Sequence, residues 1–305
     1  MKVLVATVKP FAPAAIEKIK SIIEDRGFEF ALLEKYDDNS QLLDAIADAD
    51  AVIIRSDKIT NEVMNAAKNL KIVVRAGAGY DNVDLDSARA KDIVVMNTPG
   101  QNSNAVAELA LGMMVFLARN KFKGKAGVEL KDKKIGIHAY GNVGKNVSRI
   151  AKGFDMDVFA YDPFVANADI EVDGVTAIDT VEELYSTCDY ISLHIPANKN
   201  TIKSINYDLL KNMLKGGTLV NTARKEVIDE EGLFKLMEER DDIKYISDIA
   251  PDMRSQFEDR FEDRVFFTPK KMGAQTAEAN INAGVAAAKQ IVRFFEEGDV
   301  TFKVN

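Results

Sequence analysis

The sequence predicts an α/β protein built from two doubly wound parallel sheets. Short apolar runs rich in β-branched residues alternate with helical patterns almost throughout the chain, as they do when helices cover both faces of a parallel sheet. The 305 residues, 47% of them hydrophobic, can bury one or two sizeable cores. A turn-rich break at residues 97–103 separates a first set of apolar runs from a second. We therefore expect two domains.

The first set of expected strands precedes this break and is large enough for one small sheet. These strands are Lys2–Val8, Phe28–Leu33, Ala51–Ile54, Ile72–Arg75 and Ile93–Met96. After the break, Asn102 or Ser103 can cap a long apolar helix at Asn104–Ala118. We interpret this helix as the crossing into the second domain.

The second set contains six expected strands, the number in a complete dinucleotide-binding sheet. These strands are Lys134–His138, Asp157–Tyr161, Tyr190–His194, Thr218–Asn221, Tyr245–Asp248 and Val265–Phe267. A final helix at Ala277–Glu297 is long enough to pack back onto the first domain. The predicted domains are therefore residues 1–97 with 275–305, and residues 98–274 inserted between them.

The segment Lys134–Gly144 is typical of a dinucleotide-binding βαβ unit. An apolar strand leads into a glycine turn, where backbone N–H groups can approach a pyrophosphate at a helix N-terminus. Asp162 ends the next strand 18 residues after Gly144, where a carboxylate can meet the adenosine ribose. Gly141 and Gly144 fit the pattern, but Ala139 stands in place of its first glycine. Such turns also exist without a ligand, although Asp162 would then have no evident reason to be acidic.

Composition excludes several classes of function. No apolar run reaches the length of a membrane span and the N-terminus lacks the features of a signal peptide, so we expect a cytoplasmic protein. The formal charge of −8 argues against nucleic-acid and anionic-membrane partners, whereas a local basic cluster can still bind an anionic small substrate. The single Cys188 precludes an intrachain disulfide and is interpreted as a buried structural residue.

Five further motifs carry a resemblance to a known family. They are Arg75–Asp84, Asn97–Pro99, Leu193–Pro196, Asn221–Arg224 with Asp229 and Glu230 beyond it, and Thr268–Pro269 followed by Gly273–Ala274. Their order and spacing resemble those of the D-isomer-specific 2-hydroxyacid dehydrogenases over nearly the whole chain. Arg75–Asp84 and Ile54–Thr60 are most similar to the phosphoglycerate-oxidising members. The resemblance implies a short form without the serine-binding regulatory domain of longer relatives.

The resemblance implies a Rossmann cofactor domain inserted into a smaller flavodoxin-like substrate domain, and a homodimer. NAD is favoured over NADP, because Asp162 would repel a 2′-phosphate and no arginine follows it closely. The expected cofactor-binding residues are Tyr140, Gly141, Asn142, Val143, Gly144, Asp162, His194, Ile195, Pro196, Thr222, Ala223, Arg224, Asp248 and Gly273.

Arg224 is the main candidate for binding a substrate carboxylate. It follows an expected strand end, and the C-terminal ends of strands form the ligand crevice of such sheets. In the family this arginine binds the carboxylate and the C2 oxygen, which suits a permanently charged bidentate fork. The alternative is a surface salt bridge to Asp229 or Glu230. The backbone of Ala76–Gly79 can form an N–H nest for the same carboxylate or merely shape a tight turn.

The proton-handling residue departs from the family pattern. Most members carry a histidine after the Thr-Pro pair, but this chain has Lys270 and Lys271 there. A lysine can act as a base if burial and a cationic neighbour such as Arg224 lower its pKa toward the working pH. Alignment from Thr-Pro favours Lys270 and alignment from Gly-Ala favours Lys271. Two solvated loop lysines are the alternative.

The glutamate that pairs with the family's histidine is also missing. Its position falls on Met253, and the adjacent Asp252 is a further catalytic candidate. The two histidines of the chain, His138 and His194, lie within or at the end of expected strands and are interpreted as structural.

Basic residues follow two expected strands of the first domain. Arg55, Ser56, Lys58 and Arg75 can together hold a phosphate, although such residues are often merely solvated. The resemblance favours phosphate and implies NAD-dependent oxidation of D-3-phosphoglycerate to 3-phosphohydroxypyruvate, with a lysine taking the hydroxyl proton. One alternative is a glyoxylate, hydroxypyruvate or other 2-keto acid reductase. Another is an inactive NAD-sensing binding protein, although such a protein would not need Arg224 to bind a substrate carboxylate.

Overall fold

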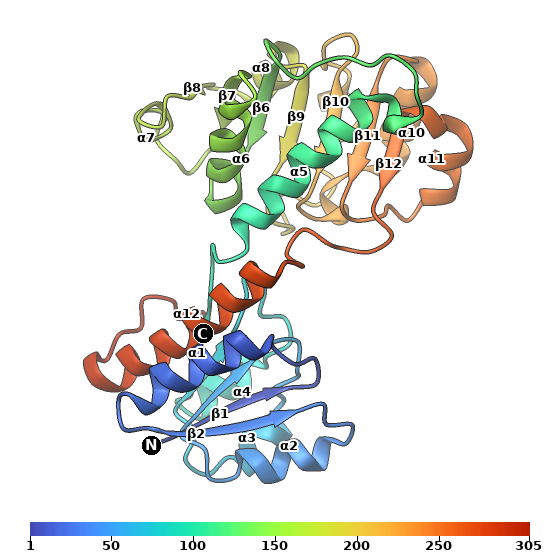
Figure 1. Ribbon diagram of the computed structural model, residues 1–305. Helices are drawn as coiled ribbons and strands as arrows, with labels where there is room; N and C mark the ends of the chain where they lie inside the picture. The colour runs from blue at the N-terminus through green and yellow to red at the C-terminus, as the bar shows by residue number, and fades with distance from the viewer. The chain divides into compact units, whose positions relative to one another are not determined.

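The computed structural model describes all 305 residues and contains two compact units (Figure 1). Unit 1 comprises Met1–Asn102 and Gln275–Asn305, and unit 2 comprises Ser103–Ala274. The first crossing therefore follows Asn102, whereas the sequence suggested a crossing after residue 97. The backbone N–H of Thr98 donates to the carbonyl of Gly77 at 2.9 Å, so the turn after residue 97 stays with unit 1.

Unit 1 contains one five-stranded parallel sheet in the order β2-β1-β3-β4-β5. The strands are β1 Lys2–Thr7, β2 Glu29–Glu34, β3 Ala51–Ile54, β4 Ile72–Arg75 and β5 Val94–Asn97. The helices are α1 Pro13–Glu24, α2 Asn39–Ile46, α3 Asn61–Ala66, α4 Leu85–Ala90 and α12 Ala277–Glu297. The predicted single sheet is confirmed, with strand ends shifted by one residue in β1, β2 and β5.

Helices cover both faces of this sheet because successive strand residues point to opposite sides. Val3 and Val5 of β1 share a core with α1 and α12, while Leu4 shares a core with α2, α3 and α4. The predicted packing of the final helix onto the first set of strands is confirmed. Gly284 of α12 permits a close approach, because a Cβ there would lie 2.7 Å from Ile19 Cδ1.

Unit 2 contains a seven-stranded parallel sheet in the order β12-β11-β10-β9-β6-β7-β8. The strands are β6 Lys134–His138, β7 Asp157–Tyr161, β8 Thr176–Ala177, β9 Tyr190–Leu193, β10 Thr218–Asn221, β11 Lys244–Ser247 and β12 Val265–Phe267. The α-helices are α5 Ser103–Ala118, α6 Asn142–Gly153, α7 Asn167–Glu171, α8 Val181–Thr187, α9 Tyr207–Leu210, α10 Glu230–Glu239 and α11 Arg254–Phe261. Short 3₁₀ helices occupy Asn120–Phe122, Lys225–Val227 and Glu262–Arg264.

The sequence predicted six of these strands and missed β8, whose two residues are too few to show a pattern.

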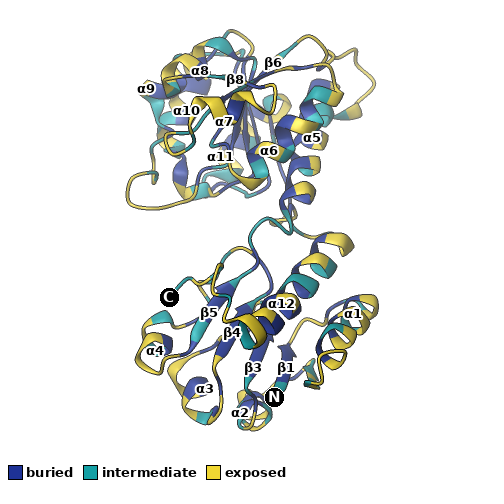
Figure 2. Cartoon of the chain, turned by 90° about the vertical axis from the view of Figure 1, so that its left-hand side faces the viewer, coloured by how far each residue is buried: buried dark blue, intermediate teal, exposed yellow.

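Helices α5, α6 and α7 pack on one face of the sheet, and α8 to α11 pack on the other. In both units the central strands are buried, and the exposed residues lie mainly on the outward sides of the helices, on the loops and on the edge strands β2 and β8, as Figure 2 shows. Cys188 is buried as predicted, and burial raises the pKa of its thiol to about 12. None of the helices combines the length and apolar character needed to cross a membrane.

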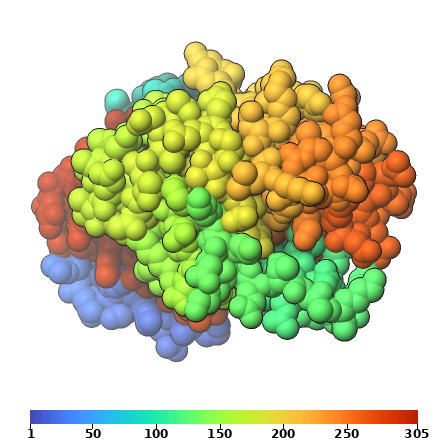
Figure 3. Space-filling model, turned by 90° about the horizontal axis from the view of Figure 1, so that it is seen from above, coloured from blue at the N-terminus to red at the C-terminus, as the bar shows by residue number.

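The strand order of unit 2 reverses between β6 and β9. From β6 the chain adds β7 and β8 on one side, and it then returns to add β9, β10, β11 and β12 on the other. The two halves are visible in Figure 3 as green to yellow and as orange surfaces on opposite sides of unit 2. Ligands of open α/β sheets bind at the carboxyl ends of the strands beside such a reversal. The functional site should therefore lie where β6, β9 and β10 end.

Candidate active site

The glycine turn joins β6 to α6 at this reversal. Ala139 has a φ of +81°, in the region that favours glycine, so the turn keeps the backbone conformation of the motif's first glycine despite the alanine. Gly144 lies where α6 meets β6. A Cβ on it would come closer than 3.0 Å to both the carbonyl oxygen of Ala139 and Cγ2 of Ile137, so only glycine permits this helix–strand approach.

The N-terminus of α6 is open to a ligand. A Cβ built on Gly141 would meet no atom within 4 Å, and no side chain caps the helix. The first turn of α6 contains no acidic residue, and Asn142, Val143 and Gly144 begin the helix with N–H groups that lack intrahelical acceptors. Free N–H groups at a helix N-terminus attract anions, so this turn fits the pyrophosphate of a dinucleotide.

Asp162 lies directly after β7 and its carboxylate is fixed by two backbone groups. Oδ2 accepts a hydrogen bond from the N–H of Tyr140 at 2.8 Å, and Oδ1 accepts one from Phe164 at 2.8 Å. Each oxygen retains a lone pair that can accept from a ribose hydroxyl. The sequence suggested the ribose contact but not the bond to the glycine turn, which links residues 22 positions apart.

Two buried polar atoms without partners lie at the ends of β9 and β10. Nε2 of His194 is 3.0 Å from Oγ of Ser192, but its Nδ1 makes no hydrogen bond, and neither does Oγ1 of Thr222. His194 and Thr222 follow strand residues that are paired in register, so the two backbones are neighbours. Buried polar groups normally have partners, so these two atoms fit a site that a polar ligand completes. Ile195 is buried and Pro196 is exposed beside them.

Both histidines are neutral at physiological pH. Burial, together with the nearby His138, lowers the pKa of His194 to about 3. Burial lowers the pKa of His138 to about 4, against an opposing effect of Asp162. His138 Nδ1 lies 3.3 Å from the hydroxyl of Tyr185 within the core. These surroundings favour the structural interpretation of His138.

Arg224 is exposed at the end of the loop after β10. Its Nη1 donates to the carbonyl of Ala223 at 2.9 Å, and it forms no ion pair with Asp229 or Glu230. The buried Asn221 amide shapes the loop, since its Oδ1 accepts from Ala223 N at 2.9 Å and its Nδ2 donates to Arg224 O at 3.0 Å. The charged fork therefore has no carboxylate partner within the chain.

The loop that carries the two lysines is organised by Asp248. Its buried carboxylate accepts backbone hydrogen bonds from Met272 and Gly273, both at 2.8 Å, and lies 3.0 Å from Oγ1 of Thr268. Lys270 and Lys271 are both exposed in this loop. Neither amine is therefore buried in this arrangement. Asp248 was predicted from the sequence to contact the cofactor, but its part in building the loop was not predicted.

Asp252 is exposed and forms an ion pair with Lys225, with Nζ 2.5 Å from Oδ1. The carboxylate of Glu230 accepts from the backbone N–H groups of Asp252 at 3.0 Å and of Met253 at 2.8 Å. Glu230 therefore shapes the turn that contains the family's glutamate position. Sequence reasoning considered Glu230 only as a partner of Arg224.

In unit 1, Arg55 and Arg75 lie together at the ends of the neighbouring strands β3 and β4. Nε of Arg75 donates to the carbonyl of Arg55 at 2.9 Å, and Nη2 of Arg55 donates to Oδ1 of Asn280 at 2.6 Å. Burial lowers the pKa of Arg55, and burial together with Arg55 lowers the pKa of Arg75. Both pKa values are lowered because burial disfavours the charged form of each guanidinium.

Ser56 and Lys58 are exposed and line a different pocket of unit 1, of about 320 Å³. Its walls also carry Asp37, Asp38 and Asp57, so the surroundings of Lys58 are mainly acidic. The structure therefore does not group Ser56 and Lys58 with the arginines as a cationic cluster. Sequence reasoning missed Asp57, because its partners Val8 and Tyr36 come from distant segments.

One backbone N–H group of the predicted nest already has an acceptor within the chain. Ala76 donates its backbone N–H to the carbonyl of Ile54 at 2.8 Å and is occupied. The N–H groups of Gly77, Ala78 and Gly79 have no backbone acceptor, and Gly77 has a φ of +147° that favours glycine. Three N–H groups thus remain available to a carboxylate.

The comparison with known proteins identifies the family to which this combination of sites belongs. Residues 3–305 match the sequence profile of the D-isomer-specific 2-hydroxyacid dehydrogenase catalytic domain. The chain belongs to the D-isomer-specific 2-hydroxyacid dehydrogenases. The predicted fold of two parallel α/β sheets is that of the family.

Two relatives that are named for different reactions are similar to the chain. A hydroxypyruvate reductase from Thermotoga maritima is 35% identical over 285 residues, which cover 87% of this chain and 91% of that protein. A D-3-phosphoglycerate dehydrogenase from Methanocaldococcus jannaschii is 35% identical over 82% of this chain but only 51% of its own length. The chain thus spans about half the length of that enzyme.

A solved structure of the family is similar over the whole chain. It is the NAD⁺-bound 3-phosphoglycerate dehydrogenase of Entamoeba histolytica, with 50% sequence identity and a TM-score of 0.85. The alignment covers 100% of this chain and 98% of that one. The similar proteins thus include both 3-phosphoglycerate dehydrogenases and a hydroxypyruvate reductase.

Proposed function

We propose that the chain is an NAD-dependent D-3-phosphoglycerate dehydrogenase that produces 3-phosphohydroxypyruvate for serine biosynthesis in the cytoplasm. The observation that carries the proposal is the pairing of Arg55 and Arg75 at neighbouring strand ends of unit 1. Two part-buried guanidiniums suit a phosphate dianion, and an unphosphorylated hydroxy acid has less need of them. The similarity to the Entamoeba histolytica enzyme supports the same substrate.

The cofactor fits unit 2. When bound, NAD accepts the hydride that leaves C2 of the hydroxy acid. The open N-terminus of α6 would hold the pyrophosphate, and Asp162 would accept hydrogen bonds from the adenosine ribose. The nicotinamide half would be held at the strand ends by His194 Nδ1, Thr222 Oγ1, the backbone around Ala223, and the Asp248–Gly273 pair.

Arg224 binds the substrate carboxylate and C2 oxygen, because its guanidinium has no carboxylate partner within the chain. A cation beside the C2 oxygen stabilises the negative charge that develops there as the hydroxyl proton leaves. In unit 1, the free N–H groups of Gly77, Ala78 and Gly79 are themselves donors that suit a carboxylate.

A lysine takes the hydroxyl proton. Lys270 is the first candidate and Lys271 the second, since both lie in the loop that Asp248 fixes. The exposed amines require a bound substrate and cofactor to exclude water before either becomes an effective base. Asp252 is the remaining candidate, with its ion pair to Lys225 as the competing role.

A panel of substrates tests the proposal on the purified protein. We expect oxidation of D-3-phosphoglycerate with NAD at a kcat/KM well above that for D-glycerate or D-lactate, and little activity with NADP. Sedimentation analysis in the same buffer tests the proposed homodimer. Preference for unphosphorylated acids, or NAD binding with no turnover of any acid, would contradict the proposal.

The second candidate is a hydroxypyruvate reductase. The similarity that covers 91% of the Thermotoga maritima enzyme favours it. In that case NADH-dependent reduction of hydroxypyruvate should exceed that of 3-phosphohydroxypyruvate, and Arg55→Ala should affect the two substrates equally. NAD binding without turnover would instead indicate a sensing protein.

A further inference from the structure

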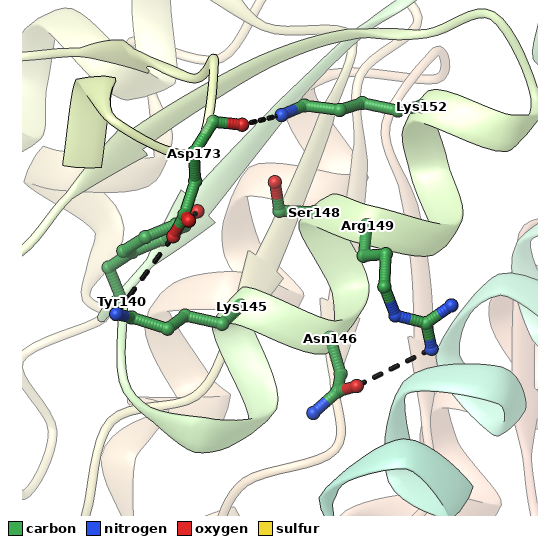
Figure 4. Close-up of a pocket in the computed structure, with 7 residues that line it drawn as sticks. All are labelled: Tyr140, Lys145, Asn146, Ser148, Arg149, Lys152 and Asp173. Carbon is green, nitrogen blue, oxygen red and sulfur yellow. Dashed lines mark hydrogen bonds and ion pairs between the residues drawn. The ribbon is translucent and has the colours of Figure 1, made fainter.

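A pocket of about 380 Å³ lies on the outer side of α6 in unit 2. Lys145, Arg149 and Lys152 line it, and their spacing of four and three residues puts all three cations on one side of the helix. Asp173, in the turn after α7, lines the opposite wall, as Figure 4 shows. The pocket is thus lined by three cations and one carboxylate, although the formal charge of the whole chain is −8.

These cations are not neutralised within the pocket. Nζ of Lys145 is 3.9 Å from Oδ2 of Asp173, which makes a weak ion pair. Lys152 donates to the backbone carbonyl of Asp173 and not to its carboxylate. The Arg149 guanidinium donates to the amide oxygens of two asparagines, the nearer of them Asn104 at 2.5 Å, and these carry no charge. At least two positive charges therefore remain available to a ligand.

The carboxylate of Asp173 is held in place from inside the unit. The hydroxyl of the buried Tyr140 donates to Asp173 Oδ2 at 3.0 Å. Because Asp173 is fixed, an anion that enters the pocket competes with a stationary carboxylate for Lys145. Removal of the Asp173 charge should then strengthen the binding of an anion.

We propose that this pocket binds a small anion that bears phosphate groups. The arginine offers a planar fork and the two lysines offer mobile point charges, which together match adjacent phosphate oxygens. Ser148 and Asn146 also line the pocket. The volume falls within the range of about 300–1,000 Å³ that is typical of small-molecule sites. The site is separate from the residues proposed to bind the substrate and does not depend on which hydroxy acid is oxidised.

Calorimetric titration with inorganic pyrophosphate tests the proposal. The protein is saturated with NADH, so that the N-terminus of α6 is covered, and carries Arg55→Ala, which removes the competing phosphate site of unit 1. We expect one binding event, at least 10-fold weaker after Arg149→Ala and similarly weaker after Lys145→Ala. Lys235→Ala, which removes an exposed lysine of α10 paired at 3.9 Å with Glu239, is the matched control and should leave the affinity unchanged.

A gain of affinity provides an independent readout. Asp173→Asn keeps an oxygen that can accept from Tyr140 but removes the competing charge, so pyrophosphate should bind at least 3-fold more tightly. Loss of folding cannot produce such a gain. No binding in the Arg55→Ala protein, equal binding after Arg149→Ala, or weaker binding after Asp173→Asn would each overturn the proposal.

Discussion

The backbone N–H of Tyr140 donates to Oδ2 of Asp162 at 2.8 Å, so the carboxylate that is proposed to meet the ribose also holds the glycine turn. Asp162→Ala should therefore narrow the preference for NADH over NADPH and, in addition, lower the affinity for both. Loss of a hydrogen bond to a charged group also costs about 1.5–3 kcal/mol of stability. Fluorescence titration with each cofactor and urea unfolding measure the two effects. Equal NADH affinity in wild type and variant would contradict the ribose contact, and equal stability would contradict the role of Asp162 in holding the turn.

Ala139 should be a site at which glycine stabilises the protein. Its φ of +81° is strained for alanine, by roughly 1–2 kcal/mol, while glycine adopts it freely. Part of this gain is lost to the greater flexibility of glycine in the unfolded chain. We expect Ala139→Gly to raise the free energy of unfolding by about 1 kcal/mol in urea titrations.

Ala168→Gly is the matched control for this substitution. It lies exposed within α7, where glycine costs about 1 kcal/mol relative to alanine. The two variants should therefore shift the urea midpoint in opposite directions. A destabilised Ala139→Gly protein would mean that the alanine methyl makes packing contacts worth more than the strain.

Arg55→Ala should raise KM for D-3-phosphoglycerate far more than KM for an unphosphorylated 2-hydroxy acid. Asn280→Ala is the control, because it removes the partner of Arg55 at 2.6 Å but keeps the cation. We expect the control to change both KM values by a similar small factor. A uniform loss in Arg55→Ala would point to damage to unit 1 and not to a phosphate contact.

Lys270→Ala should lower kcat by roughly the 10²–10⁴-fold associated with general acid–base groups and leave NADH affinity unchanged. Lys271→Ala should be milder. In the oxidation direction the neutral amine is the base, so the rate should rise with pH. Lys270→His should retain partial activity with the rise shifted to lower pH, since histidine loses its proton earlier. Near-wild-type turnover in both alanine variants would move the role to Asp252 or a bound water.

Acidification should destabilise the protein through its two histidines. The pKa values of His138 and His194 are about 4 and about 3 when folded, below the value of about 6.5 that histidine has in an unfolded chain. Between about pH 6.5 and 4 the unfolded state therefore binds more protons than the folded state. The free energy of unfolding falls as the pH falls through this range. For His138 the loss is at most roughly 3 kcal/mol. Urea unfolding of His138→Asn should show a flatter pH profile than wild type over this window, and parallel profiles would contradict the assignment.

Much of the fold could be predicted because it depends on local patterns. Strand β6 and helix α12 have the predicted bounds, since a buried parallel strand and a long helix carry strong periodicity. Strand β8 has two residues and is defined only by its pairing with β7, which no local pattern encodes. The candidate active site likewise combines residues that the local sequence reveals with contacts that only the fold reveals. Arg224 was visible as a charged residue after a strand, whereas its lack of a carboxylate partner depends on where Asp229 and Glu230 fold.

Residues that act through distant partners escaped prediction. Asp57 joins Val8 and Tyr36, and Glu230 holds a turn that lies more than 20 residues away. Each is a carboxylate in a loop or at a helix start, a setting in which most carboxylates are merely solvated. Only the fold shows which backbone N–H groups they meet.

Unit 1 is built from two separate segments of the chain, and this constrains how the protein can fold during synthesis. All five strands of its sheet are made first, but the helix that completes one face, α12, is made after the whole of unit 2. Until α12 leaves the ribosome, apolar side chains of α1 such as Ile19 and Ile23, which it would cover, stay exposed to solvent. Unit 2 is continuous and can fold as soon as residue 274 emerges. A stalled chain that ends before residue 277 should therefore contain a protease-resistant unit 2 and a first hundred residues that depend on chaperones.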